Sequence, residues 1–569
     1  MMAPLRPAGR VAGVSAYRVP RHPAPVDLDL RGNEGAVPDV ALLESLRGSD
    51  VLRRYPDVGP VRRRLAARFG LPEARVLVTA GGDDALDRLC RAVLEPGRSL
   101  LLPTPGFEMT RRYAALAGAE VVEVPWEGAV FPRDAVLASI CESTGLVALT
   151  SPNNPTGATI PWPTVEAIAA AAARSGAVVL LDLAYVEFAA EDPTQDALAL
   201  GNVVVVRTVS KAWGLAGIRV GFALGPAPVL TWMAAAGAPY AVSAPSLALV
   251  GAALDAGDVA MEDFVAGVRE GRAALSETLS DAGCAVVPSE ANFVFARSPR
   301  ARWLADGLAG LGIGVRTFPT RAGLEDALRV AVPPTDDGRA RLAAGLAAVA
   351  RPEALLFDMD GVLVDVSRSY RAAIVAAAEE FGVRVTAEDI RSIKAAGRAN
   401  NDWVVTWRLI QSAGVDASLE AVTAAFESAY QGSGGRPGLW TQEPLLVDTA
   451  LLDALAARVP LGVVTGRPRR DAERLLAEAG WADRFDVVVC MEDGPAKPDP
   501  APVRAALALL GVARAWMVGD TPDDIRAARA AGVVPLGIRA PGDPDPAPLS
   551  AAGAARVLPS IASLLELLP

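Results

Sequence analysis

Two carboxylates stand close together at the end of an apolar run in LLFDMDGVLVD, residues 355–365. Asp358 ends the run and Asp360 follows two positions later, so a turn past a strand can aim both at one point. Carboxylates this close repel one another and need a cation or a shared proton. The segment therefore predicts a polar site that binds a cation or shares a proton, whereas Asp365 is interpreted as a solvated loop charge.

Polar residues also follow other apolar runs in the same part of the chain. They are Thr465 in PLGVVTG, Lys497 in AKPDP, and Asp520 and Asp524 in AWMVGDTPDDI. Because the carboxyl ends of parallel strands meet at one edge of a sheet, we expect a hydroxyl, a lysine and several acids to converge there.

A second set of reactive residues lies earlier in the chain. Lys211, in TVSKAWGLAGIRVG, follows the apolar run NVVVVR, and Asp182 lies inside the apolar run LLDLAY. A buried carboxylate needs a cationic partner, because an unpaired charge in a core costs several kcal/mol. SPNNPTG (151–157) ends another run, and AGGDDAL (80–86) opens a helix whose backbone N–H groups can bind a phosphate.

The elements that must position these residues alternate along the chain. Continuous apolar runs separated by helical stretches between about residues 36 and 225 indicate a mostly parallel sheet covered on both faces. Residues 260–350 predict a smaller α+β lobe, and the next strand begins directly after residue 351. A helical stretch over 366–445 and renewed alternation predict a doubly wound sheet with a helical insertion after its first strand.

Composition narrows the class of protein. A chain of 569 residues, 51% apolar and 21% charged, indicates three or four globular domains. No window has the 18 apolar residues of a membrane span, and the N-terminus has no apolar signal-peptide core. The four separated cysteines predict reduced thiols and a cytoplasmic location, and the net charge of −11 argues against nucleic acid. The single histidine, His22, is expected at the surface, so acid–base chemistry must use other side chains.

The segments around Lys211 and Asp182 resemble the fold-type-I pyridoxal-phosphate aminotransferases, especially the histidinol-phosphate aminotransferase branch, over about residues 25–350. The resemblance implies that Lys211 forms the Schiff base with pyridoxal phosphate. It implies that Asp182 keeps the pyridine nitrogen protonated and that Asn154 and Tyr185 bind the phenolic oxygen. The residues implied to bind the cofactor phosphate or stack on its ring are Gly82, Asp83, Thr208, Ser210, Arg219 and Phe107.

The same resemblance implies a homodimer and an arginine for the amino donor. Tyr55, in RRYPD, matches a tyrosine that reaches the cofactor phosphate of the partner subunit. Arg329, in ALRVAV, matches the arginine that binds the α-carboxylate through its bidentate fork. The chain departs from the family in RGNEG (31–35), which lacks the usual proline. It also carries Phe107 and Thr110 where the closest branch often has tyrosine, which leaves the keto substrate open.

The later cluster resembles the haloacid dehalogenase superfamily with a helical cap, over about residues 353–545. The resemblance implies that Asp358 attacks phosphorus to form an aspartyl-phosphate and that Asp360 serves as acid and base. Thr465 and Lys497 are implied to hold the phosphoryl group. The residues implied to bind Mg²⁺ are Asp358, Asp360 through its carbonyl, Asp520 and, in support, Asp524. The acid at position 360 favours a phosphatase over a dehalogenase or an ATPase, with a mutase left open. The cap segment KAAGRANNDWVVTW (394–407) is a candidate substrate-contacting loop.

We therefore expect an α/β chain in which a pyridoxal-phosphate transferase fold, residues 1–351, is fused to a Rossmann-like hydrolase with a helical cap, residues 352–569. The large domain is expected at about 36–235 and the small lobe at 1–35 plus 236–351. The best-fitting pair of reactions is transamination between histidinol phosphate and imidazole-acetol phosphate with glutamate, followed by hydrolysis to histidinol, two consecutive steps of histidine biosynthesis. The alternatives are a decarboxylase of an amino-acid phosphate with an amino-alcohol phosphate phosphatase, or a specialised aminotransferase fused to an unrelated phosphatase.

Overall fold

The computed structural model describes residues 5–12, 14, 16, 21–47, 50–395, 401–541 and 545–569. The chain divides into two compact units. Unit 1 consists of Met1–Pro20, Leu30–Ser298 and Arg316–Arg339, and unit 2 of Arg21–Asp29, Pro299–Val315 and Ala340–Pro569. The chain thus passes from one unit to the other several times, and this division does not coincide with the predicted boundary at residue 351, which stays a prediction.

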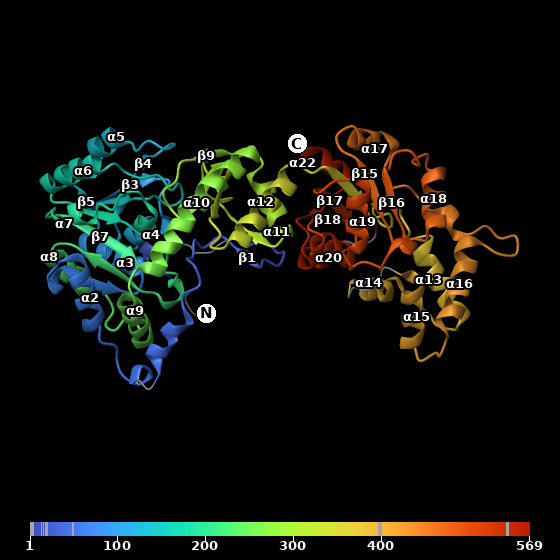
Figure 1. Cartoon of the computed structure of the whole chain (residues 1–569), viewed down its shortest axis with the longest axis horizontal. Helices are drawn as coiled ribbons and strands as arrows, with labels where there is room; N and C mark the ends of the chain where they lie inside the picture. The colour runs from blue at the N-terminus through green and yellow to red at the C-terminus, as the bar shows by residue number, and fades with distance from the viewer. Residues whose placement is uncertain are drawn as a thin grey trace. The chain divides into compact units, whose positions relative to one another are not determined.

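Unit 1 is built on a seven-stranded sheet (Figure 1) with the strand order β2-β8-β7-β6-β5-β3-β4. All neighbours pair in parallel except β8, which runs antiparallel to β2 and β7. The strands are β2 Val76–Thr79, β3 Ser99–Thr104, β4 Glu120–Pro125, β5 Thr144–Thr150, β6 Val178–Asp182, β7 Val203–Thr208 and β8 Gly221–Leu224. The predicted mostly parallel sheet is confirmed.

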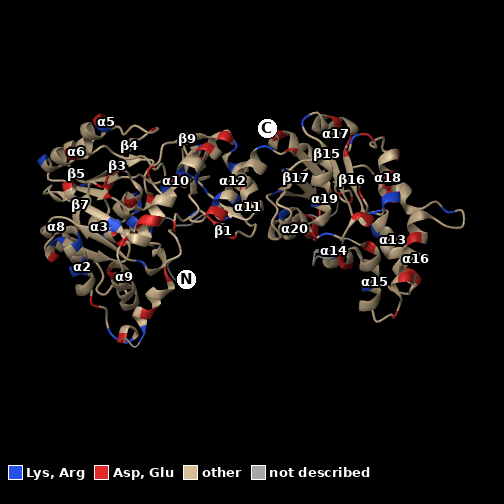
Figure 2. Ribbon diagram, in the orientation of Figure 1, with Lys and Arg blue, Asp and Glu red and all other residues tan. Residues whose placement is uncertain are grey.

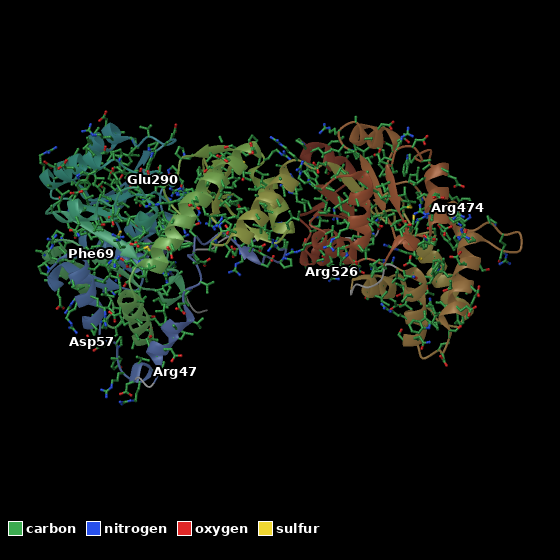
Figure 3. All side chains as sticks on the ribbon, viewed as in Figure 1. Arg47, Asp57, Phe69, Glu290, Arg474 and Arg526 are labelled. Carbon is green, nitrogen blue, oxygen red and sulfur yellow. The ribbon has the colours of Figure 1, made fainter. Side chains whose placement is uncertain are left out.

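Both faces of this sheet are buried, which explains its unbroken apolar strands. Alternate residues of one strand enter different cores: Val203 and Val205 of β7 lie in one cluster, and Val204 and Val206 in the other. Phe69, labelled in Figure 3, packs from α2 onto Phe222 of β8 with ring centroids 5.7 Å apart. The helices of unit 1 around the sheet are α2 Gly59–Phe69, α3 Gly82–Val93, α4 Glu108–Ala117, α5 Arg133–Ser139, α6 Trp162–Arg174, α7 Thr194–Leu198, α8 Ala227–Ala236 and α9 Ala244–Ala256.

A second, antiparallel sheet in unit 1 has the order β12-β13-β10-β9. Its strands are β9 Ala285–Val287, β10 Phe293–Arg297, β12 Arg316–Thr317 and β13 Ala327–Ala331, and the long helix α10, Val259–Asp281, precedes them. These elements confirm the α+β pattern predicted for residues 260–350. The register sets Arg329 of β13 opposite Phe295 of β10.

Unit 2 contains a six-stranded parallel sheet with the order β16-β15-β14-β17-β18-β19. Its strands are β14 Ala354–Phe357, β15 Leu461–Val464, β16 Val487–Val489, β17 Ala515–Gly519, β18 Val534–Ile538 and β19 Arg556–Leu558. The covering helices are α17 Thr449–Ala456, α18 Arg469–Glu478, α19 Ala501–Leu510, α20 Pro522–Ala530, α21 Ala547–Ala552 and α22 Leu564–Leu567. The predicted doubly wound fold is confirmed, and β19 forms one edge of the sheet. Residues 542–544 lie outside the described residues.

Four helices form the predicted cap between β14 and β15. They are α13 Tyr370–Glu380, α14 Ala387–Ala395, α15 Asp402–Ser412 and α16 Leu419–Gln431. The two connections between the cap and the sheet run beside each other, because Asp365 donates its backbone N–H to Pro444 and Leu446 donates to Leu363. The predicted substrate-contacting loop falls partly outside the described residues, at 396–400.

Elements from residues before 351 also belong to unit 2. These are β1 Leu28–Asp29, which pairs with β11 Ile313–Gly314, the helix α11 Ala301–Gly310, and the part of the next helix that begins at Ala340. Trp303 of α11 meets Trp516 of β17 edge-on, with ring centroids 4.7 Å apart. The Trp516 indole N–H donates to the carbonyl of Ala348 at 2.9 Å, in α12 Asp336–Ala350. This buried aromatic pair therefore attaches α11 and α12 to the six-stranded sheet of unit 2.

We expect Trp516→Ala to lower the free energy of unfolding of unit 2 by about 3–5 kcal/mol, because Trp516 is fully buried and its loss leaves a cavity. Denaturant unfolding followed by circular dichroism measures the change. Leu509→Ala, at an exposed position of the same unit, is the control and should shift it by less than about 0.5 kcal/mol. Equal shifts for the two variants would contradict the packing role of Trp516.

The surface and the single histidine complete the fold. Acidic and basic side chains are interspersed on both units (Figure 2). Among the described residues no single helix is long and apolar enough to cross a membrane, and only α9 and α10 together, across an 82° bend, meet such a criterion.

His22 is partly buried in unit 2 rather than at the surface as expected. Its Nε2 lies 3.0 Å from the carbonyl of Ala555, and burial lowers its pKa.

Candidate functional site

Lys211 stands in the loop after β7, where its side chain meets the N-terminal segment 31–35. Its Nζ donates to the carbonyl of Gly32 at 3.0 Å and lies 5.8 Å from the centre of the Tyr185 ring. A Cβ atom on Gly35 would lie 2.1 Å from the carbonyl oxygen of Lys211, so only glycine allows this close approach. The RGNEG segment, which lacks the family's proline, therefore packs directly against the lysine loop.

Hydrogen bonds gather the side chains around Tyr185. Its hydroxyl accepts from Nδ2 of Asn154 at 3.4 Å and from Nδ2 of Asn33 at 3.3 Å. Arg329 donates to Oδ1 of Asn154 at 2.7 Å and to the carbonyl of Arg31 at 2.6 Å. The structure thus brings Lys211, Asn154, Tyr185 and Arg329 together in one cluster.

Two asparagines of this cluster were missed by the sequence prediction. Asn33 is held with a positive φ of 53°, and its carbonyl accepts a hydrogen bond from Asn292 at 3.1 Å. Both are almost fully buried. Asparagine is one of the few residues that tolerate this backbone conformation, which is the signal that RGNEG offers at residue 33.

Asp182 ends β6 and is almost completely buried. Burial raises the pKa of its carboxyl to about 7; Asp83 adds to the rise, and the backbone N–H of Ala184 and the charge of Lys211 oppose it. A buried carboxylate with so high a pKa suits a cationic partner such as a protonated ring nitrogen.

This pKa makes the stability of the cofactor-free protein depend on pH. Between pH 3.8 and about 7 the unfolded chain has lost the Asp182 proton while the folded chain keeps it, so the free energy of unfolding falls as the pH rises. We expect Asp182→Asn to stabilise the cofactor-free protein by a few kcal/mol at pH 8, and hardly at all at pH 4. Urea unfolding of both proteins at the two pH values measures the difference, and an equal difference at both would contradict the buried carboxyl's role.

The residues predicted to bind a phosphate form a second group in unit 1. Gly81, with a φ of 84°, precedes α3, whose first residues are Gly82 and Asp83. The Thr208 hydroxyl donates to the Ser210 hydroxyl at 2.8 Å. Arg219 donates to Asp83 at 3.2 Å, and a Cβ on Gly81 would lie 2.7 Å from its guanidinium. A helix start, two hydroxyls and a guanidinium fit a phosphate group, so this set and Asp182 fit the two ends of pyridoxal phosphate.

Phe107 and Tyr55 are the two remaining residues predicted at the cofactor site. Phe107 precedes α4 and packs at the edge of one core of the sheet. Tyr55 is 81% exposed and stacks on Tyr240, which is also exposed, with ring centroids 4.7 Å apart.

The predicted cluster of acids in unit 2 assembles at the carboxyl ends of β14, β15 and β17. Lys497 donates to Oδ1 of Asp358 at 2.8 Å and to the carbonyl of Val464 at 3.0 Å, and its Nζ lies 2.5 Å from Oδ1 of Asp524. Carboxylate oxygens of Asp358, Asp520 and Asp524 lie within 4.8 Å of one another. Asp524 also caps α20, where it accepts from the backbone N–H of Thr521.

The charges in this cluster are strongly coupled. Burial raises the pKa of Asp358 to about 7; Lys497 opposes the rise, and Asp524 and Asp360 add to it. Burial, Asp524 and Asp358 raise the pKa of Asp520 well above its usual range, against the charges of Lys394 and Arg371. Crowded carboxylates of this kind fit a divalent cation with oxygen ligands, such as Mg²⁺. Gly361 allows this crowding, since a Cβ there would lie 2.1 Å from Oδ2 of Asp520.

Arg467 is a residue of this site that the sequence prediction missed. Its side chain is 1% exposed, and its Nε donates to Oδ1 of Asp360 at 2.5 Å. Its NH1 donates to Glu443 at 2.9 Å and to the hydroxyl of Tyr430 at 3.3 Å. Its guanidinium also lies 4.8 Å from the Tyr370 ring centre. The Asp360 carboxylate is thus held by an arginine that also contacts the cap and its second connection.

Thr465 is placed as predicted, at the end of β15. It is buried, and its hydroxyl accepts the backbone N–H of Arg467 at 3.2 Å. The structure therefore brings Asp358, Thr465, Lys497 and the metal candidates to one edge of the sheet, while the side chain of Asp360 points to Arg467.

Comparisons with known proteins agree with this division of chemistry. Residues 28–346 match the family of class I and II aminotransferases, and residues 352–532 match the haloacid dehalogenase-like hydrolases. A solved structure of histidinol-phosphate aminotransferase from Sinorhizobium meliloti in complex with pyridoxal 5′-phosphate is similar with a TM-score of 0.53 and 27% identity. The matched region covers 57% of this chain and 91% of the Sinorhizobium protein.

Curated relatives cover each half separately. A histidinol-phosphate aminotransferase of Paramagnetospirillum magneticum is 34% identical over 318 residues, 54% of this chain and 87% of its own length. An aromatic amino acid aminotransferase of Mycobacterium bovis is 34% identical over 355 residues, 60% of this chain and 97% of its own length. An imidazoleglycerol-phosphate dehydratase of Phytophthora nicotianae is 47% identical over 237 residues in the hydrolase region, 38% of this chain. The chain spans about half, 52%, of that last relative.

Proposed function

Since the chain belongs to the class I and II aminotransferase family and carries a haloacid dehalogenase-like hydrolase domain, we propose that it is a bifunctional enzyme with one reaction at Lys211 and another at Asp358. The first is transamination with pyridoxal phosphate, and the second is hydrolysis of a phosphate monoester with Mg²⁺. The observation that supports the proposal is the presence of two polar clusters, one around Lys211 in unit 1 and one around Asp358 in unit 2.

The first cluster supports transamination through the roles of its side chains. When bound, pyridoxal phosphate supplies an electron sink for the carbanion that forms at the substrate Cα. The Lys211 amine removes and returns the proton at that carbon, and Asp182 holds the proton on the ring nitrogen. Asn154 and Tyr185 donate to the phenolic oxygen. The residues that bind the phosphate are Gly82, Asp83, Thr208, Ser210 and Arg219, with Phe107 against the ring.

The amino donor fits Arg329, whose fork binds an α-carboxylate. We propose glutamate as donor and the pair of histidinol phosphate and imidazole-acetol phosphate as the other substrates, which the name and coverage of the Paramagnetospirillum relative support. The equally similar aromatic amino acid aminotransferase supports an aromatic keto acid as second candidate. The dehydratase name of the relative over the hydrolase half agrees with a place in histidine biosynthesis.

The second cluster supports hydrolysis in two steps. An oxygen of Asp358 bonds to phosphorus while the ester P–O bond breaks, and Asp360 gives its proton to the leaving oxygen. Water then attacks phosphorus, loses a proton to Asp360, and displaces Asp358 to release inorganic phosphate. Thr465 and Lys497 hold the phosphoryl oxygens. The carboxylates that would hold Mg²⁺ are Asp358, Asp520 and Asp524, with the carbonyl of Asp360.

A homodimer is part of the proposal. Tyr55 and Tyr240 are large, exposed and stacked on each other, as expected of side chains that a second subunit covers. We propose that Tyr55 completes the phosphate site of the partner subunit and that the enzyme acts in the cytoplasm.

The test supplies purified protein with pyridoxal phosphate, Mg²⁺, 2-oxoglutarate and histidinol phosphate, and follows glutamate and inorganic phosphate separately. p-Nitrophenyl phosphate serves as a general phosphatase substrate. Glutamate formation supports the transaminase, whereas CO₂ release from an amino-acid phosphate without glutamate would favour the decarboxylase alternative. Absence of phosphate release from every ester would contradict the hydrolase assignment.

A further inference from the structure

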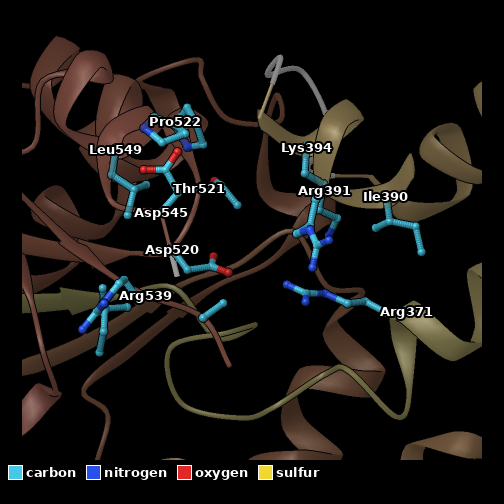
Figure 4. Close-up of a pocket in the computed structure, with 13 residues that line it drawn as sticks. Arg371, Ile390, Arg391, Lys394, Asp520, Thr521, Pro522, Arg539, Asp545 and Leu549 are labelled. Carbon is cyan, nitrogen blue, oxygen red and sulfur yellow. The ribbon is translucent and has the colours of Figure 1, made fainter. Parts of the chain in front are cut away.

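A pocket lined mainly by basic side chains adjoins the acid cluster of unit 2 (Figure 4). We define this basic pocket by Arg371, Arg391, Lys394 and Arg539, which line it together with Asp520 and Thr521. Arg371 lies on α13, and Arg391 and Lys394 lie on α14, so the cap supplies three of the four cations. Arg539 follows β18 in the sheet domain. The pocket thus lies between the cap and the strand ends.

The basic pocket is continuous with the reaction centre. Asp520 lines the pocket and also belongs to the carboxylate cluster with Asp358 and Asp524. In Figure 4 the guanidinium of Arg371 points toward Asp520. A phosphate monoester whose phosphorus faces Asp358 would therefore extend its leaving group toward these cations.

Some of the positive charge in the pocket is already paired and some is not. Lys394 lies 3.0 Å from Asp402, and Arg391 pairs with Glu388 one turn earlier. The Nε atom of Arg371 is buried and has no hydrogen-bond partner among the described residues. Basic side chains also outnumber the acids, Asp520 and Asp545, in the lining. The pocket therefore retains capacity for an anion.

The lysine at position 394 also supports the binding of an anion in this pocket. The chain has only three lysines among its 55 basic residues: Lys211, Lys394 and Lys497. Two of them occupy the proposed reaction centres, and the third lines the basic pocket. An ammonium group is a compact point charge that binds phosphate or carboxylate, as Lys497 is placed to do beside Asp358.

We propose that the basic pocket binds a second anionic group, a carboxylate or a second phosphate, on the phosphate monoester that the hydrolase site cleaves. The inference rests on the proposed hydrolase function and narrows its substrate class. Arginine forks match both anions, and a lining in which basic side chains outnumber acidic ones favours a negatively charged leaving group beside the reaction centre. An ammonium-bearing ester such as histidinol phosphate would bring another cation into this lining, so the inference favours an acid-bearing ester for this site.

The test compares matched esters on the full chain with Mg²⁺. 3-Phosphoglycerate is set against glycerol 3-phosphate, which lacks the carboxylate, and fructose 1,6-bisphosphate against fructose 6-phosphate, which lacks the second phosphate; histidinol phosphate is a fifth substrate. We expect kcat/KM to be about 10- to 100-fold higher for the acid-bearing member of at least one pair. The pair that shows the preference tells carboxylate from phosphate recognition.

Variants test whether the pocket residues cause the preference for acid-bearing esters. Arg371→Ala and, separately, the exposed Arg539→Ala should each reduce the preference ratio by about tenfold or more, while Arg504→Ala, outside the pocket, should retain it. Equal kcat/KM within both pairs in the wild type, a preference that neither pocket variant reduces, or faster hydrolysis of histidinol phosphate than of every acid-bearing ester would overturn the inference. In these cases the hydrolase function itself still stands. No phosphate release from any ester, p-nitrophenyl phosphate included, would overturn the hydrolase function and the pocket inference together.

Discussion

Asp358→Asn is expected to lower phosphate release by at least about 10³-fold while glutamate formation continues at the wild-type rate. The Asp358 carboxylate is buried, accepts a hydrogen bond from Lys497 at 2.8 Å, and lies in the acid cluster with Asp520 and Asp524. An amide has nearly the same shape but offers no anionic oxygen to attack phosphorus. The measurement is inorganic phosphate release from p-nitrophenyl phosphate, beside glutamate formation from 2-oxoglutarate in the same preparation.

The matched control for Asp358 lies in the same segment. Asp365 accepts a hydrogen bond from the backbone of Ser367 at 2.8 Å and is not part of the acid cluster. Asp365→Asn should retain phosphate release within a few fold. If Asp358→Asn hydrolysed esters as fast as Asp365→Asn, the aspartyl-phosphate mechanism would be wrong.

Lys211→Ala is expected to reduce glutamate formation by at least about 10³-fold without changing phosphate release. The Lys211 amine is the group placed against Gly32 and near Tyr185, and alanine leaves no amine to move the substrate proton. Equilibrium binding of pyridoxal phosphate, followed by absorbance, shows whether the remaining residues still hold the cofactor.

Arg64→Ala is a control for Lys211, because Arg64 lies in the same unit and pairs with Asp255 in a surface ion pair. It should leave both activities within a few fold of the wild type, as is usual for exposed pairs. Transamination by Lys211→Ala at the rate of Arg64→Ala would rule out the assigned role of Lys211.

Most of the site residues that the sequence alone predicts, in both units, lie at the ends of strands. Asp182 and Asp358 can be identified from the sequence because a carboxylate after a run of buried apolar residues needs a nearby compensating group, such as a cation. The alternation of apolar runs and helices predicts the parallel sheets for the same physical cause, since both faces are buried.

Arg467 shows why other site residues are not predicted in this way. The segment TGRPRR contains three arginines, and only the fold determines that Arg467 is buried against Asp360 while Arg469 and Arg470 lie at the surface. Its partners are separated from it along the chain: Asp360 by 107 residues, Tyr430 on α16 by 37 and Glu443 in the connection after the cap by 24. Asn292 and Asn33 are 259 residues apart. Such contacts arise from tertiary packing, which no local pattern records.

The assignment of α11 and α12 could not be predicted either. Their sequences lie within the stretch that matches aminotransferases, at 28–346 for almost all of their length. The indole of Trp516, on a hydrolase strand, nevertheless packs on Trp303 and bonds to Ala348. Two tryptophans more than two hundred residues apart give no sign in the sequence that they meet.

That aromatic pair bears on how the fused gene can evolve. A stop codon near residue 351 would delete the hydrolase strands and leave Trp303, now buried at 3%, and the apolar side of α11 without their covering sheet. The aminotransferase half would then expose a new apolar surface to other chains and would be prone to aggregate. Separation of the two halves would therefore require compensating substitutions on the apolar surface that it exposes, so this packing disfavours loss of either segment.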